Sequence, residues 1–131
     1  MFTSFPRLFG ILTSPNRENP VYVRLENPKR KFTNNYGDIP QFINKADRDP
    51  WDVIVPGYVS LDHNKKYKFK NLLGVYALPN GNHKLIIDVY SDCERQPHKI
   101  KNHVKDFRKN YEKHTKLKGS VLFFTTFDGL G

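Results

Sequence analysis

The segment Asp47-Arg48-Asp49-Pro50-Trp51-Asp52-Val53 joins three crowded carboxylates to the start of an apolar run. The aspartates stand at spacing i, i+2 and i+5 around the proline. Carboxylates are hard oxygen ligands that suit Mg²⁺, and a bound cation offsets their mutual repulsion. The segment therefore predicts a metal-binding turn directly before a strand, with a solvated acidic turn as the alternative.

Motifs on both sides of this segment narrow the interpretation. Asn35-Tyr36-Gly37-Asp38-Ile39-Pro40 precedes it, and Leu72–Leu78 and Lys84–Val89 follow it. In this order the motifs resemble the soluble Mg²⁺-dependent (family I) inorganic pyrophosphatases. That family's pattern is Asn-Tyr-Gly-aromatic-Ile-Pro, then Asp-x-Asp-Pro-x-Asp-Val, then a Leu-Gly strand and a lysine-bearing strand. The resemblance covers roughly residues 15–127 and is most specific over 35–53.

The resemblance implies a role for each matching residue. Asp47 and Asp52 match metal ligands, and Asp49 matches the base beside the nucleophilic water. The residues that match phosphate-binding groups are Arg24, Tyr36, Lys84 and Tyr111. In such a site several Mg²⁺ ions neutralise pyrophosphate and convert a bound water into hydroxide. The expected cofactor is therefore Mg²⁺, and the expected ligand is pyrophosphate or phosphate.

Several positions depart from the family's pattern. The loop Pro79-Asn80-Gly81-Asn82-His83 lacks the two metal-binding aspartates that the family carries there, and it is left open whether Asn80 and Asn82 replace them. Gly10 and Leu12 stand near the place where the family has a Lys-x-Glu pair, and Phe32 stands where it has a tyrosine. Glu112 stands where the family has a lysine, although Lys113 is next to it, and the family's C-terminal helix is missing. The sequence therefore predicts a weakened metal site.

The charge of the chain points to anionic partners. There are 22 Lys plus Arg against 13 Asp plus Glu, a formal net charge of +9. Much of the excess lies between residues 95 and 118, whereas members of the pyrophosphatase family are mostly acidic. This basic segment predicts binding to nucleic acid or to a protein assembly through charge. A solvated lysine-rich helix face is the alternative.

Two functions follow from these observations. The first is a weak or non-catalytic relative that serves as a basic structural or binding subunit of a larger assembly. Its basis is the missing metal ligands, because losing one electrostatic donor costs about 10²- to 10³-fold in rate. The alternative is an active Mg²⁺-dependent pyrophosphatase that hydrolyses diphosphate to two phosphates.

The expected fold is mainly β, a small closed antiparallel barrel of the pyrophosphatase type with a flanking helix. We expect one domain over residues 1–131, with 1–17 as an irregular N-terminal extension. Ile100, Val104, Phe107 and Tyr111 form one apolar stripe and predict a helix from Lys99 to His114. Residues 28–47 are expected to form a long loop. The expected strands are 21–25, 51–59, 67–78, 84–89 and 121–127, with a hairpin at 79–82.

The compartment and the oligomeric state are less constrained by the sequence. The single cysteine, Cys93, suits a reducing intracellular compartment. No apolar run approaches the roughly 20 residues needed to span a bilayer. Arg7 and Arg17, with no acid before Glu18, suit a mitochondrial presequence, and the cytoplasm is the alternative. The family commonly forms oligomers, so the resemblance adds a second copy of the chain to the expected partners.

Overall fold

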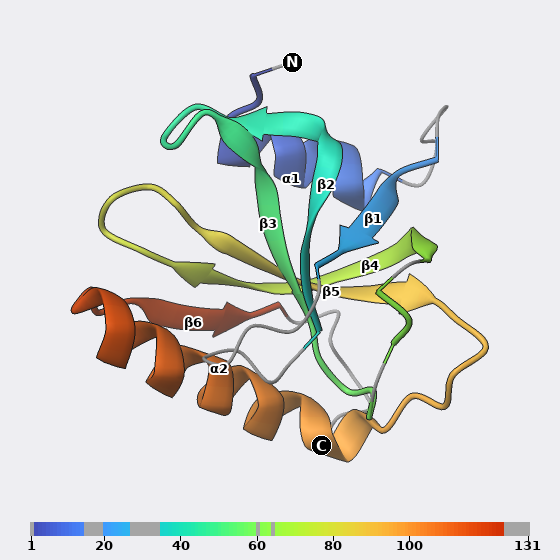
Figure 1. Ribbon diagram of the computed structural model, residues 1–131. Coiled ribbons are helices and arrows are strands. Elements are labelled where there is room, and N and C mark those ends of the chain that lie inside the picture. The colour runs from blue at the N-terminus through green and yellow to red at the C-terminus, as the bar shows by residue number, and fades with distance from the viewer. Residues whose placement is uncertain (1, 15–19, 27–34, 60, 64, 125–131) are drawn as a thin grey trace.

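Over the residues that the computed structural model describes (2–14, 20–26, 35–59, 61–63 and 65–124), six strands and two α-helices follow one another (Figure 1). The strands are β1 (Tyr22–Leu25), β2 (Asn35–Asn44), β3 (Asp49–Val55), β4 (Lys66–Ala77), β5 (Lys84–Tyr90) and β6 (Ser120–Phe123). The helices are α1 (Phe5–Thr13) and α2 (Ile100–Thr115), and a short 3-10 helix, η1 (Pro97–Lys99), leads into α2.

Five of these strands close into a barrel. Their order is β1-β2-β3-β5-β4, and β4 also pairs with β1, which completes the ring. β3 and β5 are parallel, whereas the other pairs are antiparallel. The neighbours β4, β1, β2 and β3 lie in the spatial order of a Greek key. β6 extends the sheet along the second half of β4. The predicted fold class, mainly β with a small closed barrel and a flanking helix, is confirmed.

The interior of the barrel is filled by alternate side chains of each strand. In β3, Trp51, Val53 and Val55 belong to the largest apolar cluster, which lies inside the ring. Asp52 and Ile54 point to the outer side, where Ile54 packs in a second cluster with residues of α2. The strands therefore carry two different surfaces, an apolar interior and an outer face on which charged groups stand.

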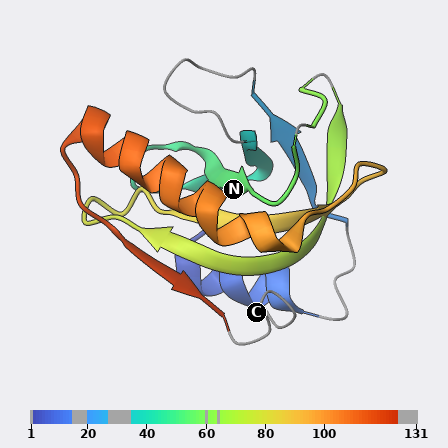
Figure 2. The same cartoon turned by 90° about the horizontal axis from the view of Figure 1, so that it is seen from below.

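The helix α2 covers part of this outer face, as Figure 2 shows. It was predicted from Lys99 to His114 and runs from Ile100 to Thr115, and the four residues of its predicted apolar stripe are all buried. Phe107 and Tyr111 of that stripe pack against Ile54 and Tyr76 of the barrel. The helical period of the apolar residues thus gave both the element and its packed side.

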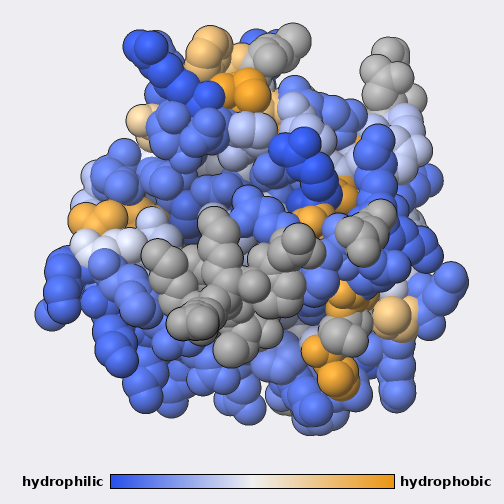
Figure 3. Space-filling view, viewed as in Figure 1, coloured by the Kyte–Doolittle hydropathy of each residue, from blue (hydrophilic) through white to orange (hydrophobic). Residues whose placement is uncertain are grey.

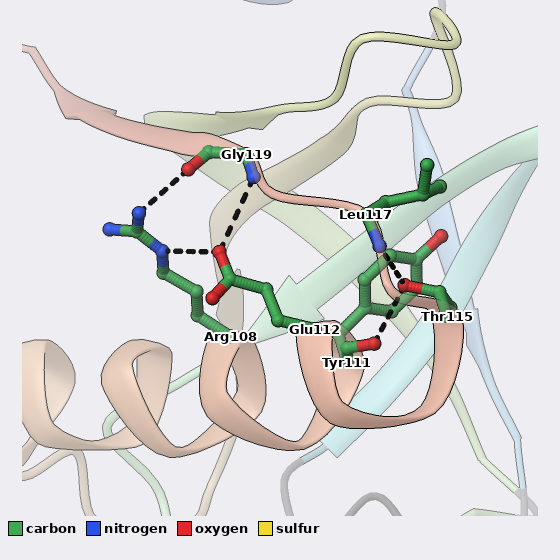
Figure 4. Close-up of polar contacts among 6 residues, drawn as sticks. All are labelled: Arg108, Tyr111, Glu112, Thr115, Leu117 and Gly119. Atoms are coloured by element: carbon green, nitrogen blue, oxygen red, sulfur yellow. Dashed lines mark hydrogen bonds and ion pairs between the residues drawn. The ribbon is translucent and has the colours of Figure 1, made fainter.

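The chain is fastened where it leaves α2 and enters β6 (Figure 4). The Arg108 guanidinium donates to Glu112 Oε1 (3.0 Å) and to the carbonyl oxygen of Gly119 (2.7 Å), and the Gly119 N–H donates to Glu112 Oε1 (3.3 Å). Glu112, the residue that departs from the family's lysine, is therefore engaged in holding this connection. The ion pair with Arg108 lowers the pKa of Glu112.

The expected loop at 28–47 is wrong over its described part. Residues 27–34 lie outside the described residues, but Asn35–Asn44 form β2, paired with β1 and β3. Gly37 and Pro40 suggested a loop because both residues are rare inside strands. Gly37 is required here by a close approach of the β1 backbone, and Pro40 lies in the irregular part of the β2–β3 pairing between Ile39 and Ile43.

The expected irregular extension at 1–17 is also wrong over its described part, because Phe5–Thr13 form α1. Ser4 caps the helix by accepting a hydrogen bond from the Arg7 N–H, and Pro6 lies in the first turn, where its missing N–H is harmless. Leu8 and Leu12 are buried in the main core cluster. The helix therefore closes one end of the barrel's apolar interior.

The remaining elements agree with the predictions with small changes of boundary. The hairpin between β4 and β5 is present, and Gly81 has the positive φ (81°) that its turn requires. β3 ends at Val55, before Pro56-Gly57, and the described part of the last strand ends at Phe123. Across the described residues, no helix is long and apolar enough to cross a membrane.

Candidate functional site

A row of polar residues crosses the outer face of the barrel. The pairing registers, with the ion pair between Asp52 and Lys84, place one residue of each strand side by side. The order is Arg24 (β1), Asp38 (β2), Asp52 (β3), Lys84 (β5) and Tyr76 (β4). Residues opposite each other in neighbouring strands point to the same face of a sheet. Three of the seven predicted site residues therefore share this row, although they are far apart in the sequence.

The centre of the row is a buried ion pair. Lys84 Nζ lies 2.6 Å from Asp52 Oδ2, and their side chains are 3% and 17% exposed. The Tyr36 hydroxyl donates a hydrogen bond to Asp52, and Lys84 Nζ lies 5.3 Å from the centre of the Tyr111 ring. Burial raises the pKa of Asp52, and the opposing effects of Lys84 and Tyr36 only partly offset it. These four residues form the site cluster.

Aromatic stacking fixes the two tyrosines of the site cluster. The Tyr36 ring stacks on Phe107 at 5.4 Å, and Phe107 stacks on Tyr111 at 5.9 Å, so both rings are held by α2. Burial, followed by the neighbouring Asp52 charge, raises the pKa of Tyr36 and of Tyr111. Both phenols therefore stay protonated at neutral pH, and the Tyr36 hydroxyl donates to Asp52.

Arg24 stands apart from the site cluster. Its Nη2 lies 3.0 Å from Asp38 Oδ2, and its side chain is 61% exposed. The ion pair with Asp38 raises the pKa of Arg24. Asp38 occupies the position of the aromatic residue in the pyrophosphatase pattern, so this departure supplies a carboxylate that neutralises the predicted phosphate-binding arginine.

Asp47 and Asp49 lie at the turn between β2 and β3. Asp47 Oδ1 accepts a hydrogen bond from the Asp49 N–H (3.0 Å), and Arg48 between them has a positive φ of 61°. Asp47 is near enough to raise the pKa values of Asp52 and Tyr111 by its charge. The Asp49 side chain is exposed. The three aspartates therefore differ in environment, and one of them builds the turn.

The described residues contain no preformed cluster of metal ligands. In the ranges that the model describes, no group of three or more His, Cys, Asp or Glu side chains could hold one. Asp52 directs an oxygen at Lys84, and an oxygen of Asp47 is used by the turn. The Asn80 side-chain oxygen accepts from the Asn82 N–H (3.0 Å), while the Asn82 side-chain oxygen is buried and meets no hydrogen-bond partner among the described residues. The expected Mg²⁺ remains a prediction.

A second buried ion pair was not predicted from the sequence. Asp88 is almost fully buried in β5 and lies 3.3 Å from Arg95 Nη1, and its other oxygen accepts from the Tyr58 hydroxyl at 2.8 Å. The signal was present, because an acid within the apolar run 84–89 needs a cation or a donor nearby. Arg95 had been assigned to the basic segment, and the structure gives it a structural partner instead.

The basic segment contains residues in two different environments. Arg95 and Arg108 are engaged in internal ion pairs, whereas exposed lysines at every fourth position follow one side of α2: Lys101, Lys105, Lys109 and Lys113. We call these four residues the α2 lysine row. α2 also carries two acids, of which Glu112 is paired with Arg108 and Asp106 is exposed.

Comparisons of the chain with protein-family models, with curated proteins and with solved structures give no match. The resemblance to pyrophosphatases therefore depends on the motif residues alone, and the family assignment stays a prediction.

Proposed function

We propose that this protein is a basic binding subunit without pyrophosphatase turnover, built on a pyrophosphatase-like barrel with a depleted metal site. The observation that carries the proposal is the α2 lysine row. Like charges four residues apart on a helix destabilise it by about 0.2–0.5 kcal/mol per pair. The α2 lysine row contains three such pairs in succession. Their repulsion is offset when a polyanionic partner lies along the row.

The surroundings of the α2 lysine row support this proposal. Its members are exposed, and α2 is held against the barrel by its opposite, apolar side. Figure 3 shows that the face seen in Figure 1 is mostly hydrophilic, with small and separate apolar patches. Binding through the α2 lysine row should weaken as salt rises, because its contacts with a partner would be between charges.

The site cluster supports the absence of turnover. Asp52, a predicted metal ligand, is compensated by Lys84 and Tyr36, and Arg24 is compensated by Asp38. A carboxylate with an internal cation no longer requires Mg²⁺ to offset its charge. Four of the groups expected to hold metal and phosphate are thus partnered within the protein: Asp52, Lys84, Tyr36 and Arg24.

Lys105→Glu should weaken binding and stabilise the fold at once. The change turns two like-charge pairs, with Lys101 and Lys109, into two opposite-charge pairs, so the free energy of unfolding should rise by about 1 kcal/mol. We expect the variant to elute from a heparin column at lower salt than the wild type, and to unfold at higher urea concentration. Lys45→Glu, on the exposed β2–β3 turn, is the matched control for overall charge. Equal elution of the two variants would contradict a specific role for the helix.

The alternative function is an active Mg²⁺-dependent inorganic pyrophosphatase. It is favoured by the gathering of Tyr36, Asp52, Lys84 and Tyr111 in one cluster, with Asp47 close by. Phosphate release from pyrophosphate in millimolar Mg²⁺ decides between the two functions, with Asp49→Asn measured alongside. We expect the wild type and the variant to give the same background rate. Release by the wild type that the variant loses would establish the enzyme and overturn our proposal.

A further inference from the structure

A second basic surface lies on the barrel itself, along the first half of β4. Lys66, Lys68 and Lys70 are exposed, whereas Tyr67 and Phe69 between them are buried in the core. The alternation places the three ammonium groups on the outer face. The Cα atoms of one lysine and the next are roughly 6.7 Å apart, which is twice the rise per residue of a strand. This surface shares no residue with the α2 lysine row.

Two tyrosines flank these lysines on the neighbouring strands. Lys68 is opposite Tyr22 of β1 and opposite Tyr90 of β5, so the three residues form one row across the sheet. The ammonium group of Lys66 lies 5.0 Å from the Tyr22 ring centre, and those of Lys68 and Lys70 lie 5.5 and 5.6 Å from the Tyr90 ring centre. Tyr90 is 55% exposed. We call Tyr22, Lys66, Lys68, Lys70 and Tyr90 the lysine–tyrosine face.

The lysine–tyrosine face is far from the end of α2. Figures 1 and 2 both place β1, the start of β4 and the end of β5 together, on the side of the molecule opposite the last turn of α2. Two acids of the described residues form ion pairs with other cations: Asp38 with Arg24 at 3.0 Å, and the exposed Asp92 with Lys65 at 3.9 Å. In the part of the chain that the structure describes, no ion pair joins Lys66, Lys68 or Lys70 to a carboxylate.

We propose that the lysine–tyrosine face binds a single-stranded nucleic acid. Cations interleaved with exposed rings fit such a strand, because lysines contact its phosphates while unpaired bases stack on aromatic side chains. A base that stacks on Tyr90 takes a place now held by an ammonium group, which is then free to meet a phosphate. The spacing of the lysines is comparable to that of successive phosphates in an extended strand. A duplex hides its base faces and offers only the phosphates.

The test is the binding of a short fluorescent oligouridylate, followed by anisotropy at several salt concentrations. Tyr90→Ala should weaken binding about tenfold or more and leave the salt dependence unchanged, because it removes a stacking ring. Tyr90→Phe, which keeps the ring, should bind like the wild type. Lys68→Gln/Lys70→Gln should lower the slope of log K against log salt by about 1.4, or roughly 0.7 for each lost phosphate contact.

Two controls separate this inference from the proposed function. Lys45→Glu, on the exposed β2–β3 turn outside both basic surfaces, should leave oligouridylate binding within about twofold of the wild type. Lys105→Glu is measured beside it to report what α2 contributes. A duplex of equal length should bind more weakly than the single strand. The inference is overturned if Tyr90→Ala binds like the wild type, if the duplex binds equally well, or if only Lys105→Glu reduces binding. The last result would leave the proposed role of α2 intact.

Discussion

Lys84→Met should destabilise the protein by about 3–5 kcal/mol at neutral pH, the loss typical of removing one partner of a buried ion pair. Lys84 is nearly fully buried, and its ammonium group lies 2.6 Å from Asp52. Methionine fills a similar volume, so the main change is a buried carboxylate left without its cation. Urea unfolding followed by circular dichroism measures the loss.

The loss in Lys84→Met should depend on pH in a defined direction. Lys84 lowers the pKa of Asp52 against the effect of burial, so its removal raises that pKa further. A carboxyl whose pKa is higher in the folded state contributes stability at low pH, and this contribution disappears as the pH rises through the folded pKa. The difference between Lys84→Met and the wild type should therefore be largest at neutral pH and shrink in acid.

The double variant Asp52→Asn/Lys84→Met is the matched control. It removes both charges, so most of the stability lost in either single variant should return. Asp52→Asn alone should be destabilising as well, because it leaves a buried ammonium group unpaired. Equal losses at neutral and acid pH, with no recovery in the double variant, would assign the loss to packing instead of charge.

Local periodicity accounts for the parts of the fold that the sequence predicted well. The stripe Ile100, Val104, Phe107 and Tyr111 repeats with the helical period, and the burial of one helix face depends on that period alone. The β4–β5 hairpin was predicted for the same reason, because its turn residues lie next to one another. Such features need no knowledge of distant segments.

Features that depend on distant segments were missed or assigned wrongly. Gly37 and Pro40 are turn residues by local propensity, and only the pairing of β2 with β1 and β3 makes them part of a strand. The partners of Asp38 and Asp88 depend on strand register in the same way. The N-terminal extension was predicted to be irregular, although Phe5–Thr13 form α1 with Pro6 in its first turn, where a proline is favourable.

The predicted site residues show the same difference between local features and features that depend on distant segments. The structure brings Tyr36, Asp52, Lys84 and Tyr111 together in the site cluster. The elements that carry the last three were predicted, whereas β2, which carries Tyr36, was predicted as a loop. Arg24 matched the pattern by counting residues, but its surroundings are set by Asp38 on the next strand. A residue's role thus follows from its partner as well as from its position in a motif.

The Asn-Tyr-Gly segment at the start of β2 makes structural contacts that do not depend on catalysis. The Asn35 side chain is buried, donates to the carbonyl oxygen of Val55 at 3.4 Å and accepts from the Leu61 N–H at 3.2 Å. It thereby ties the chain after β3 to the barrel. Tyr36 meets Asp52, and Gly37 allows β1 to approach. Each residue of the motif therefore has a structural role in the barrel.

Gly37→Ala should destabilise the protein by about 3 kcal/mol, the upper part of the range for overpacking. A methyl group at this position would lie 2.0 Å from the Arg24 carbonyl oxygen and 2.8 Å from the Leu25 Cα. Both are backbone atoms, so relief requires β1 to move away from β2. That movement would also separate Arg24 from Asp38, which now lie 3.0 Å apart.

Gly10→Ala is the control for Gly37→Ala, because it makes the same chemical change in open space. A methyl group at Gly10 meets nothing within 4 Å, and Gly10 lies inside α1. Alanine should stabilise the helix there by about 0.5–1 kcal/mol. Urea unfolding of the two variants should thus give changes of opposite sign. A loss below about 1 kcal/mol in Gly37→Ala would mean that β1 can shift on β2 at little cost, and the glycine of the motif would then need a reason outside the packing of the barrel.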